Sequence, residues 1–171
     1  MVGIEELNEK DLKEASNFVD SLFPSVYEEE PGSLDLSASL FPELYEEYLQ
    51  KTEIRNLKYW VAKSAGIIVG IIGLYNYNTD KDCEIWIGWF AVKSEFRKKG
   101  IGEKLFRFAV EKAREQGKSI LNVYTSNDPE EASGVEFYED HGFRLIGKEP
   151  WTKGMKESDE KLDKLFYQQK I

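Results

Sequence analysis

Two long runs of aromatic and β-branched residues limit the folds open to this chain more than any other feature. The runs Leu57–Ala65 and Ile67–Tyr77 have the composition that β-strands favour. Ala65-Gly66 lies where the runs meet and suits a tight turn, because glycine adopts a positive φ at little cost. The two runs therefore predict an antiparallel β-hairpin.

Further strand and helix patterns alternate along the rest of the chain. Strands are predicted at Val2–Leu7, Cys83–Val92, Ser119–Thr125, Phe143–Lys148 and Leu162–Gln169. Helices are predicted from Asn8 to the helix-breaking Pro24, over Phe41–Lys51, over Gly100–Gln116, and from Asp128 to His141. Loop-like sequences cover Ser25–Ser39, Asn78–Lys81 and Trp151–Glu160. This order predicts one mixed α/β domain over residues 1–171, with hairpins early and helical crossovers late.

The charge balance narrows the class of partner. The 171 residues carry a formal net charge of −9, whereas proteins that bind nucleic acid or membrane surfaces normally present a basic face. No window approaches the roughly 20 apolar residues of a membrane span. Cys83 is the one cysteine and His141 the one histidine, which excludes an internal disulfide and argues against a Cys/His zinc cluster. We therefore expect a cytoplasmic protein without a metal, nucleic-acid or membrane partner.

One segment carries a clear chemical signal. The predicted strand Phe90-Ala91-Val92 leads into a basic loop, Arg97-Lys98-Lys99, which opens through Gly100-Ile101-Gly102 into a helix. A helix N-terminus presents unpaired backbone N–H groups and the positive end of the helix dipole. The two glycines let the backbone approach an anion closely, and the cationic side chains stand beside them. The segment therefore predicts a site for a phosphate or pyrophosphate group.

Other interpretations of this loop fit less well. The Walker pattern Gly-x-x-x-x-Gly-Lys-Ser/Thr is absent, and Leu105 stands where a dinucleotide fingerprint has its third glycine. An ordinary strand–helix turn with solvated lysines is the remaining alternative. Charge, glycine spacing and position before a helix agree in favouring the anion site.

Two motifs resemble those of the GNAT acetyltransferases. Arg97-Lys98-Lys99-Gly100-Ile101-Gly102 is similar to the family's Arg/Gln-x-x-Gly-x-Gly/Ala loop, and Phe137–Phe143 is similar to its Tyr-x-x-x-Gly-Phe signature. The resemblance covers about Tyr59 to Lys148. It implies a mixed, mostly antiparallel sheet flanked by helices. It also implies an N-acetyltransferase that passes the acetyl group of acetyl-CoA directly to a primary amine in a ternary complex, without a metal.

The same resemblance assigns residues to acetyl-CoA. Backbone N–H groups of Phe90, Ala91 and Val92, at a β-bulge of the strand, would hold the pantetheine arm and polarise the thioester carbonyl. The pyrophosphate would be bound by Arg97, Lys98, Lys99, Gly100, Ile101 and Gly102. Gly134 would leave room for the thioester end. The family commonly has an asparagine where Glu131 stands; either Asn127 would take over its pantetheine contact, or that contact is absent. Glu131 is also predicted to close a capping box with Asp128.

Two residues are candidates for acid–base catalysis. Tyr138 matches the family's general acid, and a phenol with a reference pKa of ~10 stays protonated at neutral pH. A tyrosine packed against the sheet is the alternative. Glu84 is the candidate general base, because some family members use a glutamate on the fourth strand; a solvated strand-end carboxylate is its alternative. His141, at a helix end, is expected to be structural, and an acyl-enzyme at Cys83 is not expected.

The acceptor amine is less well specified. By resemblance, Ser21–Thr52 would line its pocket, where the aromatic and acidic residues suit a cationic amine with an apolar body; they are Phe23, Tyr27, Phe41, Tyr45, Tyr48, Glu28, Glu29, Glu30 and Asp35. Two other classes stay open: a non-catalytic acyl-CoA sensor on the same fold, and a binding protein whose basic loop holds another anion such as a nucleotide. An exposed edge on the last strand would allow a homodimer.

Overall fold

The structure is a computed structural model that describes residues 2–22, 32–151 and 162–171. Its strands are β1 (Val2–Glu6), β2 (Ile54–Ser64), β3 (Ile67–Tyr77), β4 (Glu84–Ile87), β5 (Ala91–Val92), β6 (Ile120–Ser126), β7 (Arg144–Pro150) and β8 (Asp163–Lys170). They form a sheet in the order β1-β2-β3-β4-β6-β8-β7, with β5 paired to β3. The pairing of β4 with β6 is parallel, and the other pairings among the described strands are antiparallel.

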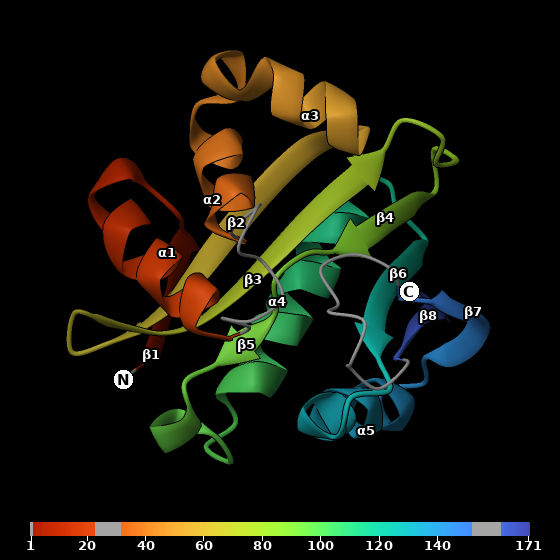
Figure 1. Cartoon of the computed structure of the whole chain (residues 1–171). Coiled ribbons are helices and arrows are strands. Elements are labelled where there is room, and N and C mark those ends of the chain that lie inside the picture. The colour runs from red at the N-terminus through yellow and green to blue at the C-terminus, as the bar shows by residue number, and fades with distance from the viewer. Residues whose placement is uncertain (1, 23–31, 152–161) are drawn as a thin grey trace.

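Helices cover both faces of this sheet (Figure 1). On one face lie α1 (Glu9–Leu22), α2 (Ser33–Leu40) and α3 (Glu46–Thr52), and on the other lie α4 (Ile101–Glu115) and α5 (Ala132–Asp140). Short 3₁₀ turns are η1 (Pro42–Tyr45), η2 (Ser94–Phe96) and η3 (Pro129–Glu131). The predicted mixed, mostly antiparallel sheet flanked by helices is thus confirmed.

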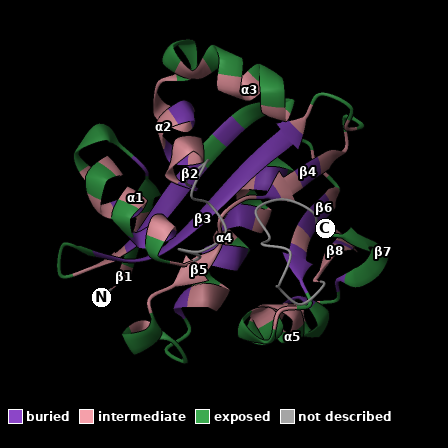
Figure 2. Ribbon diagram, in the orientation of Figure 1, coloured by how far each residue is buried: buried purple, intermediate pink, exposed green. Residues whose placement is uncertain are grey.

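Each face of the sheet has its own hydrophobic core. Alternate residues of the central strands point to opposite faces, so Tyr59 and Val61 pack under α1 and α2, whereas Trp60 and Ala62 face α4. Because β3 is covered on both sides, it is apolar along nearly its whole length and lies buried at the centre of the molecule (Figure 2).

The predicted hairpin between β2 and β3 is confirmed. Ala65 has φ 50° and Gly66 has φ 82°, and two successive positive φ values are the geometry of a type I′ hairpin turn. Within the hairpin, Tyr59 is paired with Gly73, and its ring lies across the glycine. A Cβ atom at Gly73 would stand 2.2 Å from Tyr59 Cε1, so only glycine fits beneath this buried ring.

Replacing Gly73 by alanine is therefore expected to destabilise the fold. The added methyl group would displace a ring that is 1% exposed, and overpacking of this kind costs roughly 1–3 kcal/mol. Denaturant-induced unfolding measures the change. Gly3→Ala is the matched control, because a Cβ at Gly3 meets no atom within 4 Å. Equal stabilities of the two variants would contradict the packing described here.

Four predicted elements differ from the structure. Residues 33–39 of the predicted Ser25–Ser39 loop belong to helix α2, because Leu36 and Ala38 are buried against the sheet and Asp20 accepts the Ser33 N–H at 2.9 Å. The predicted strand Cys83–Val92 is divided into β4 and β5. The predicted helix Phe41–Lys51 is divided into η1 and α3, and the predicted helix from Asp128 to His141 is divided into η3 and α5.

The last strand is not an edge of the sheet. β8 lies between β6 and β7 and pairs with both, so the expectation of an exposed edge there was wrong. The edge strands are β1 and β7. The exposed edge at β7 carries a register irregularity between Leu145 and Gly147, a feature that discourages pairing with another chain. Among the described helices, none has the length and apolar character needed to cross a membrane.

Candidate functional site

A bulge separates β4 from β5. Ile87 pairs with Leu74 and Ala91 pairs with Ile71, so three residues on this side, 88–90, face two residues on β3, 72 and 73. The segment between these pairs therefore contains one extra residue, which is the definition of a β-bulge. Gly88 still donates its N–H to Gly73 of β3 at 2.8 Å, so the chain leaves the regular ladder after that bond.

Past the bulge, the backbone of β5 has one side without a paired strand. The parallel pairing of β4 with β6 ends at Trp86 and Asn122, and β5 pairs only with β3 among the described strands. Lys93 donates its N–H to Val69 of β3 at 2.9 Å, so alternation along the strand directs the amide groups of Val92 away from β3. The carbonyl of Val92 indeed accepts a hydrogen bond from Arg97 Nε at 3.0 Å.

The predicted anion-binding loop opens helix α4 as expected. Gly100 is the N-cap residue with φ 75°, and no side chain caps the helix. The first intrahelical bond within α4 runs from Lys104 N to Gly100 O, which leaves the N–H groups of the preceding turn without an intrahelical acceptor. A Cβ at Gly100 would meet nothing within 4 Å, and Arg97, Lys98 and Lys99 are exposed beside it. The loop thus has open space, free donors and positive charge together.

Glycines also bring this helix against the bulge. A Cβ at Gly102 would lie 3.8 Å from both Phe90 Cζ and Val92 Cγ2, so the first turn of α4 contacts the bulge and β5. A Cβ at Gly70 of β3 would lie 2.8 Å from Leu105 Cδ1 and 3.0 Å from Ala91 O. Gly70 therefore allows α4 and β5 to pack closely on the same stretch of β3.

Tyr138 of α5 also packs against the bulge, through the ring of Phe90. Its ring centroid lies 6.4 Å from that of Phe90 and 5.4 Å from that of Phe143, and the residue is 7% exposed. Within the described ranges its hydroxyl group has no hydrogen-bond partner in the protein. The structure thus brings together four residues that the sequence singled out: Phe90, Val92, Gly102 and Tyr138.

The surroundings of Tyr138 favour its protonated form. Burial raises the pKa of the phenol well above its ordinary value, and the negative charge of Glu131 raises it further. Glu131 is held in place by Thr125 Oγ1, at 2.5 Å, and by the N–H of Ser126, at 2.7 Å. A buried phenol beside a fixed carboxylate remains a proton donor through the neutral pH range.

This position of Glu131 overturns the predicted capping box. Asp128 does cap the turn, since it accepts the N–H of Glu130 at 2.8 Å. The Glu131 carboxylate, however, accepts the N–H of Ser126 at the end of β6 and does not bind the N–H of Asp128. The N–H of Asp128 is directed instead at Ser126 Oγ, 3.2 Å away. The carboxylate thus accepts hydrogen bonds from donors at the end of β6, Thr125 Oγ1 and the N–H of Ser126.

Gly134 lies one turn before Tyr138 and borders open space. A Cβ there would meet no atom within 4 Å, so alanine fits the free protein. We expect Gly134→Ala to stabilise the fold by roughly 0.5–1 kcal/mol, because glycine disfavours a helix interior. If acetyl-CoA approaches this helix, the same methyl group should weaken its binding. Thermal unfolding and calorimetry measure the two effects; tighter or unchanged binding would remove Gly134 from the site.

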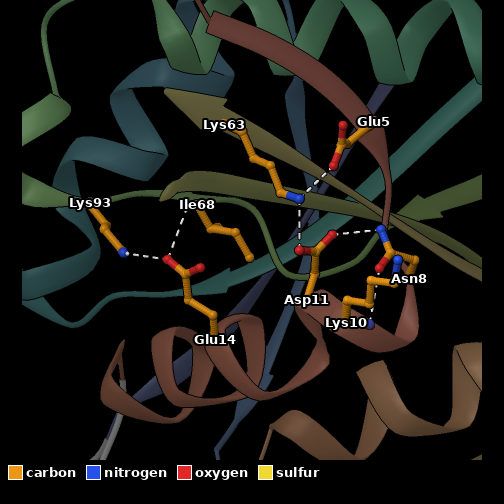
Figure 3. A network of polar contacts seen from close by, with 8 residues as sticks. All are labelled: Glu5, Asn8, Lys10, Asp11, Glu14, Lys63, Ile68 and Lys93. Carbon is orange, nitrogen blue, oxygen red and sulfur yellow. Dashed lines mark hydrogen bonds and ion pairs between the residues drawn. The ribbon is translucent and has the colours of Figure 1, made fainter. Parts of the chain in front are cut away.

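Helix α1 is fixed to the end of β5 by a carboxylate (Figure 3). Glu14 accepts the N–H of Ile68 at 3.0 Å, where a register shift between Ala62 and Lys63 disturbs the β2–β3 ladder. The same carboxylate oxygen lies 3.4 Å from Nζ of Lys93, directly after β5. Earlier on α1, Asp11 pairs with Lys63 at 2.7 Å. These bonds set the position of α1 relative to the strand that leaves the bulge.

A cleft of about 520 Å³ lies between α1 and the segment that follows β5. It is lined by Glu14, Asn17, Phe18, Ser21, Leu22, Val92, Lys93, Ser94, Glu95 and Arg97. The cleft shares Val92 with β5 and Arg97 with the predicted loop, so it extends the candidate site toward the first helix.

Among the predicted site residues, Glu84 lies away from this centre, and the side chain of Asn127 makes a different contact. Glu84 lies at the start of β4, where its carboxylate is directed at the N–H of Lys81, 3.4 Å away. Five residues along the chain separate Glu84 from Trp89 in the bulge, which is about 16 Å along an extended strand. Asn127 uses its side-chain carbonyl to accept the N–H of Asp163 at 2.7 Å, which joins the end of β6 to the start of β8.

His141 and Cys83, the other residues with reactive side chains, lie outside the site. His141 contacts the carbonyl of Phe137 at 2.7 Å through Nδ1 and Glu103 of α4 at 2.6 Å through Nε2, and so connects α5 to α4. Cys83 precedes β4 and lies away from the bulge. Among the residues that the structure describes, no three His, Cys, Asp or Glu side chains gather as a metal-ligand cluster.

The predicted acceptor region lies partly outside the described residues. Phe23, Tyr27, Glu28, Glu29 and Glu30 fall in the range 23–31, of which nothing is described. Of the others, Tyr48 donates to Asp35 at 2.7 Å. The sequence did not single out two neighbours of this pair, Tyr59 and Trp89. The glycines at 73 and 88, which make room for the Tyr59 ring, were the available signal.

Comparison with known proteins agrees with this geometry. The model of the Acetyltransferase (GNAT) family matches residues 22–143, which are 122 of the 171 residues. The Xenopus tropicalis protein named "Probable N-acetyltransferase camello" is 32% identical over 89 residues. These residues are 52% of this chain and 39% of that protein, so the match spans less than half of the relative.

Solved structures show the same fold at low sequence identity. Ribosomal-protein-alanine N-acetyltransferase from Brucella melitensis is 20% identical with a TM-score of 0.71, and the match covers 99% of both chains. The yncA protein from Salmonella typhimurium, solved with its cofactor acetyl-CoA, is 15% identical with a TM-score of 0.71, covering 99% of this chain and 94% of the other. The family model includes both site motifs and most of the sequence, and the protein therefore belongs to the GNAT acetyltransferase family.

Proposed function

We propose that this protein is an N-acetyltransferase that passes the acetyl group of acetyl-CoA directly to a primary amine in a ternary complex. The observation that carries the proposal is the meeting of the β4–β5 bulge, the uncapped start of α4 and Tyr138 at one place. The names of the Xenopus relative and of the Brucella structure support the reaction class. The Salmonella structure with acetyl-CoA supports the donor.

The described residues fit this donor. The open space at Gly100, the free N–H groups of the first turn of α4 and the cations at 97–99 would hold the pyrophosphate. The backbone of Val92, directed away from β3, would hold the pantetheine arm. Acetyl-CoA supplies the acetyl group as an activated thioester. Holding the two substrates side by side would provide much of the rate advantage, through proximity and polarisation of the carbonyl.

The transfer requires two proton movements. The acceptor reacts as the neutral amine, because an ammonium nitrogen has no lone pair; a bound ammonium therefore first releases one proton to water. The amine nitrogen then forms a bond to the acetyl carbon while the carbon–sulfur bond breaks; the nitrogen loses a proton and the sulfur gains one. Tyr138 would give the proton to the sulfur, since its surroundings keep the phenol protonated. The residue that receives the amine proton is not Glu84 in this proposal, because that carboxylate lies at the far end of β4.

An assay of thiol release tests the proposed function. Purified protein is incubated with acetyl-CoA and one amine at a time: spermidine, a peptide with an N-terminal alanine, or 2-phenylethylamine. Free CoA thiol is measured over time. We expect amine-dependent release and a product heavier than the amine by one acetyl group. Binding of acetyl-CoA with no release above the amine-free rate for any amine would contradict the enzymatic proposal and indicate the non-catalytic acyl-CoA sensor.

A further inference from the structure

Asp35 is a carboxylate with several polar neighbours but no cationic partner among the described residues. It lies in the first turn of α2 and is half-buried. Tyr48 donates to Oδ1 at 2.7 Å, and Tyr59 lies 3.5 Å from Oδ2. In the described part of the chain, no lysine, arginine or histidine forms an ion pair with Asp35. A carboxylate removed from water without a counter-charge is costly, and a cationic ligand would remove that cost.

Asp35 is held next to the bulge by tight packing. Trp89, in the middle of the bulge, donates its indole N–H to the carbonyl of Gly32 at 3.1 Å, three residues before Asp35. A Cβ at Gly32 would lie 2.6 Å from the Trp89 ring, so α2 contacts the bulge closely. The backbone N–H of Trp89 also faces the hydroxyl of Tyr59, the same phenol that neighbours Asp35.

Two glycines, Gly73 and Gly88, explain how the Tyr59 side chain reaches from β2 to the bulge. Its ring occupies the space over Gly73, and its hydroxyl would be 2.8 Å from a Cβ at Gly88. The phenol therefore lies flat across β3 and β4 and ends beside the bulge. As a result, Asp35 and the backbone proposed to hold the thioester belong to one connected cluster from α2, β2 and the bulge.

Aromatic rings extend from this cluster along the same face of the sheet. Tyr75 and Tyr77 bring their hydroxyls within 3.3 Å of each other, and both rings pack on Trp86, with centroid distances of 6.4 and 5.4 Å. The negative charge of Asp35 contributes to raising the pKa of Tyr77, after the larger effect of burial, so this phenol lies within the carboxylate's field. Aromatic faces and a carboxylate both attract cations, and the rings also offer apolar surface.

We infer that Asp35 binds the ammonium group of the acceptor, and that the acceptor is a primary amine with an apolar, preferably aromatic, body. The inference rests on the proposed function, because it places the amine beside the thioester site. Tyr48 and Tyr59 orient the carboxylate, and Trp89 joins it to the bulge. An anionic or neutral acceptor would leave the Asp35 charge uncompensated.

Calorimetry with a matched pair of ligands tests this assignment. The probes are 2-phenylethylamine, which carries the ammonium, and 2-phenylethanol, in which a hydroxyl replaces it. Each is titrated into wild type, Asp35→Asn and Asp82→Asn, all in the presence of CoA. Asp82 is an exposed carboxylate in the turn before β4 and serves as the control. Acetyl-CoA binding is measured in parallel for every protein.

We expect wild type and Asp82→Asn to bind the amine at least tenfold more tightly than the alcohol, since charge-assisted bonds dominate such differences. Asp35→Asn should bind both about equally, with an acetyl-CoA dissociation constant within about twofold of wild type. Two results would overturn the inference and leave the proposed function standing. In the first, Asp35→Asn still binds the amine more tightly than the alcohol. In the second, wild type binds acetyl-CoA but does not bind the amine more tightly than the alcohol. Failure of wild type to bind acetyl-CoA overturns both.

A second measurement does not depend on the variant folding. Intermolecular nuclear Overhauser effects between 2-phenylethylamine and wild-type protein are expected at the ring protons of Tyr48, Tyr59 and Trp89. Contacts confined to other aromatic residues, or none at these three, would place the amine elsewhere and overturn the assignment to Asp35.

Discussion

Tyr138→Phe should lower turnover by roughly tenfold or more while leaving acetyl-CoA binding nearly unchanged. The phenylalanine ring keeps the packing against Phe90 and Phe143, and the lost hydroxyl has no hydrogen-bond partner among the described residues. Stability should therefore change little. The change removes only the proton that the departing thiolate would receive. Steady-state rates with a fixed amine, and calorimetry with acetyl-CoA, separate the two effects.

Tyr167→Phe is a suitable control for this substitution. Tyr167 is buried in the same core at 3% exposure, and its hydroxyl donates to Glu139 at 3.1 Å. Its loss should reduce stability slightly and leave turnover intact. A Tyr138→Phe variant as active as wild type would assign Tyr138 to packing alone.

The raised pKa of Tyr138 gives the same variant a second signature. The folded-state pKa is above the ordinary value of 10.0, so the unfolded chain releases this proton first as pH rises. The stability that Tyr138 contributes is therefore complete below pH 10.0 and is lost progressively above it. Stability should fall more steeply above this pH in wild type than in Tyr138→Phe. Parallel curves would contradict the buried, protonated phenol.

The parts of the fold that depend on local sequence could be predicted. The β2–β3 hairpin follows from its strand composition and from Ala65-Gly66, whose backbone conformation is a local property. The start of α4 follows from Gly100, and its end follows from Gly117, which has φ 74°. In each case, a few adjacent residues determine the conformation.

The parts that depend on tertiary contacts could not be predicted. In α2 the apolar residues alternate with three serines and Asp35, which is a poor helical pattern, and burial of Leu36 and Ala38 stabilises the helix instead. Glu131 had a good local partner in Asp128, yet its carboxylate binds the end of β6. Such choices depend on neighbours that are distant in the sequence or unpaired in the sheet.

The candidate site shows the same division. The loop 97–102 and Tyr138 were singled out from motifs, and the structure brings them to one place. Glu84 was placed by its position in a strand, but its distance from the bulge depends on where β4 ends. The contact between Tyr59 and Asp35 depends on the register that sets Tyr59 over Gly73, which cannot be read from either segment alone.

Calorimetry tests most directly whether acetyl-CoA binds to the loop that opens α4. Acetyl-CoA is titrated into wild type, into a Gly100→Glu, Gly102→Glu double variant, and into Gly3→Glu as an exposed control. The double variant places two carboxylates where the phosphates would lie, so it should repel them and fill the open space. Circular dichroism verifies that each variant is folded.

We expect wild type and Gly3→Glu to bind one acetyl-CoA per chain with micromolar affinity, and the double variant to show no measurable binding. Absence of binding by wild type, or equal affinity in the folded double variant, would contradict the account of this site.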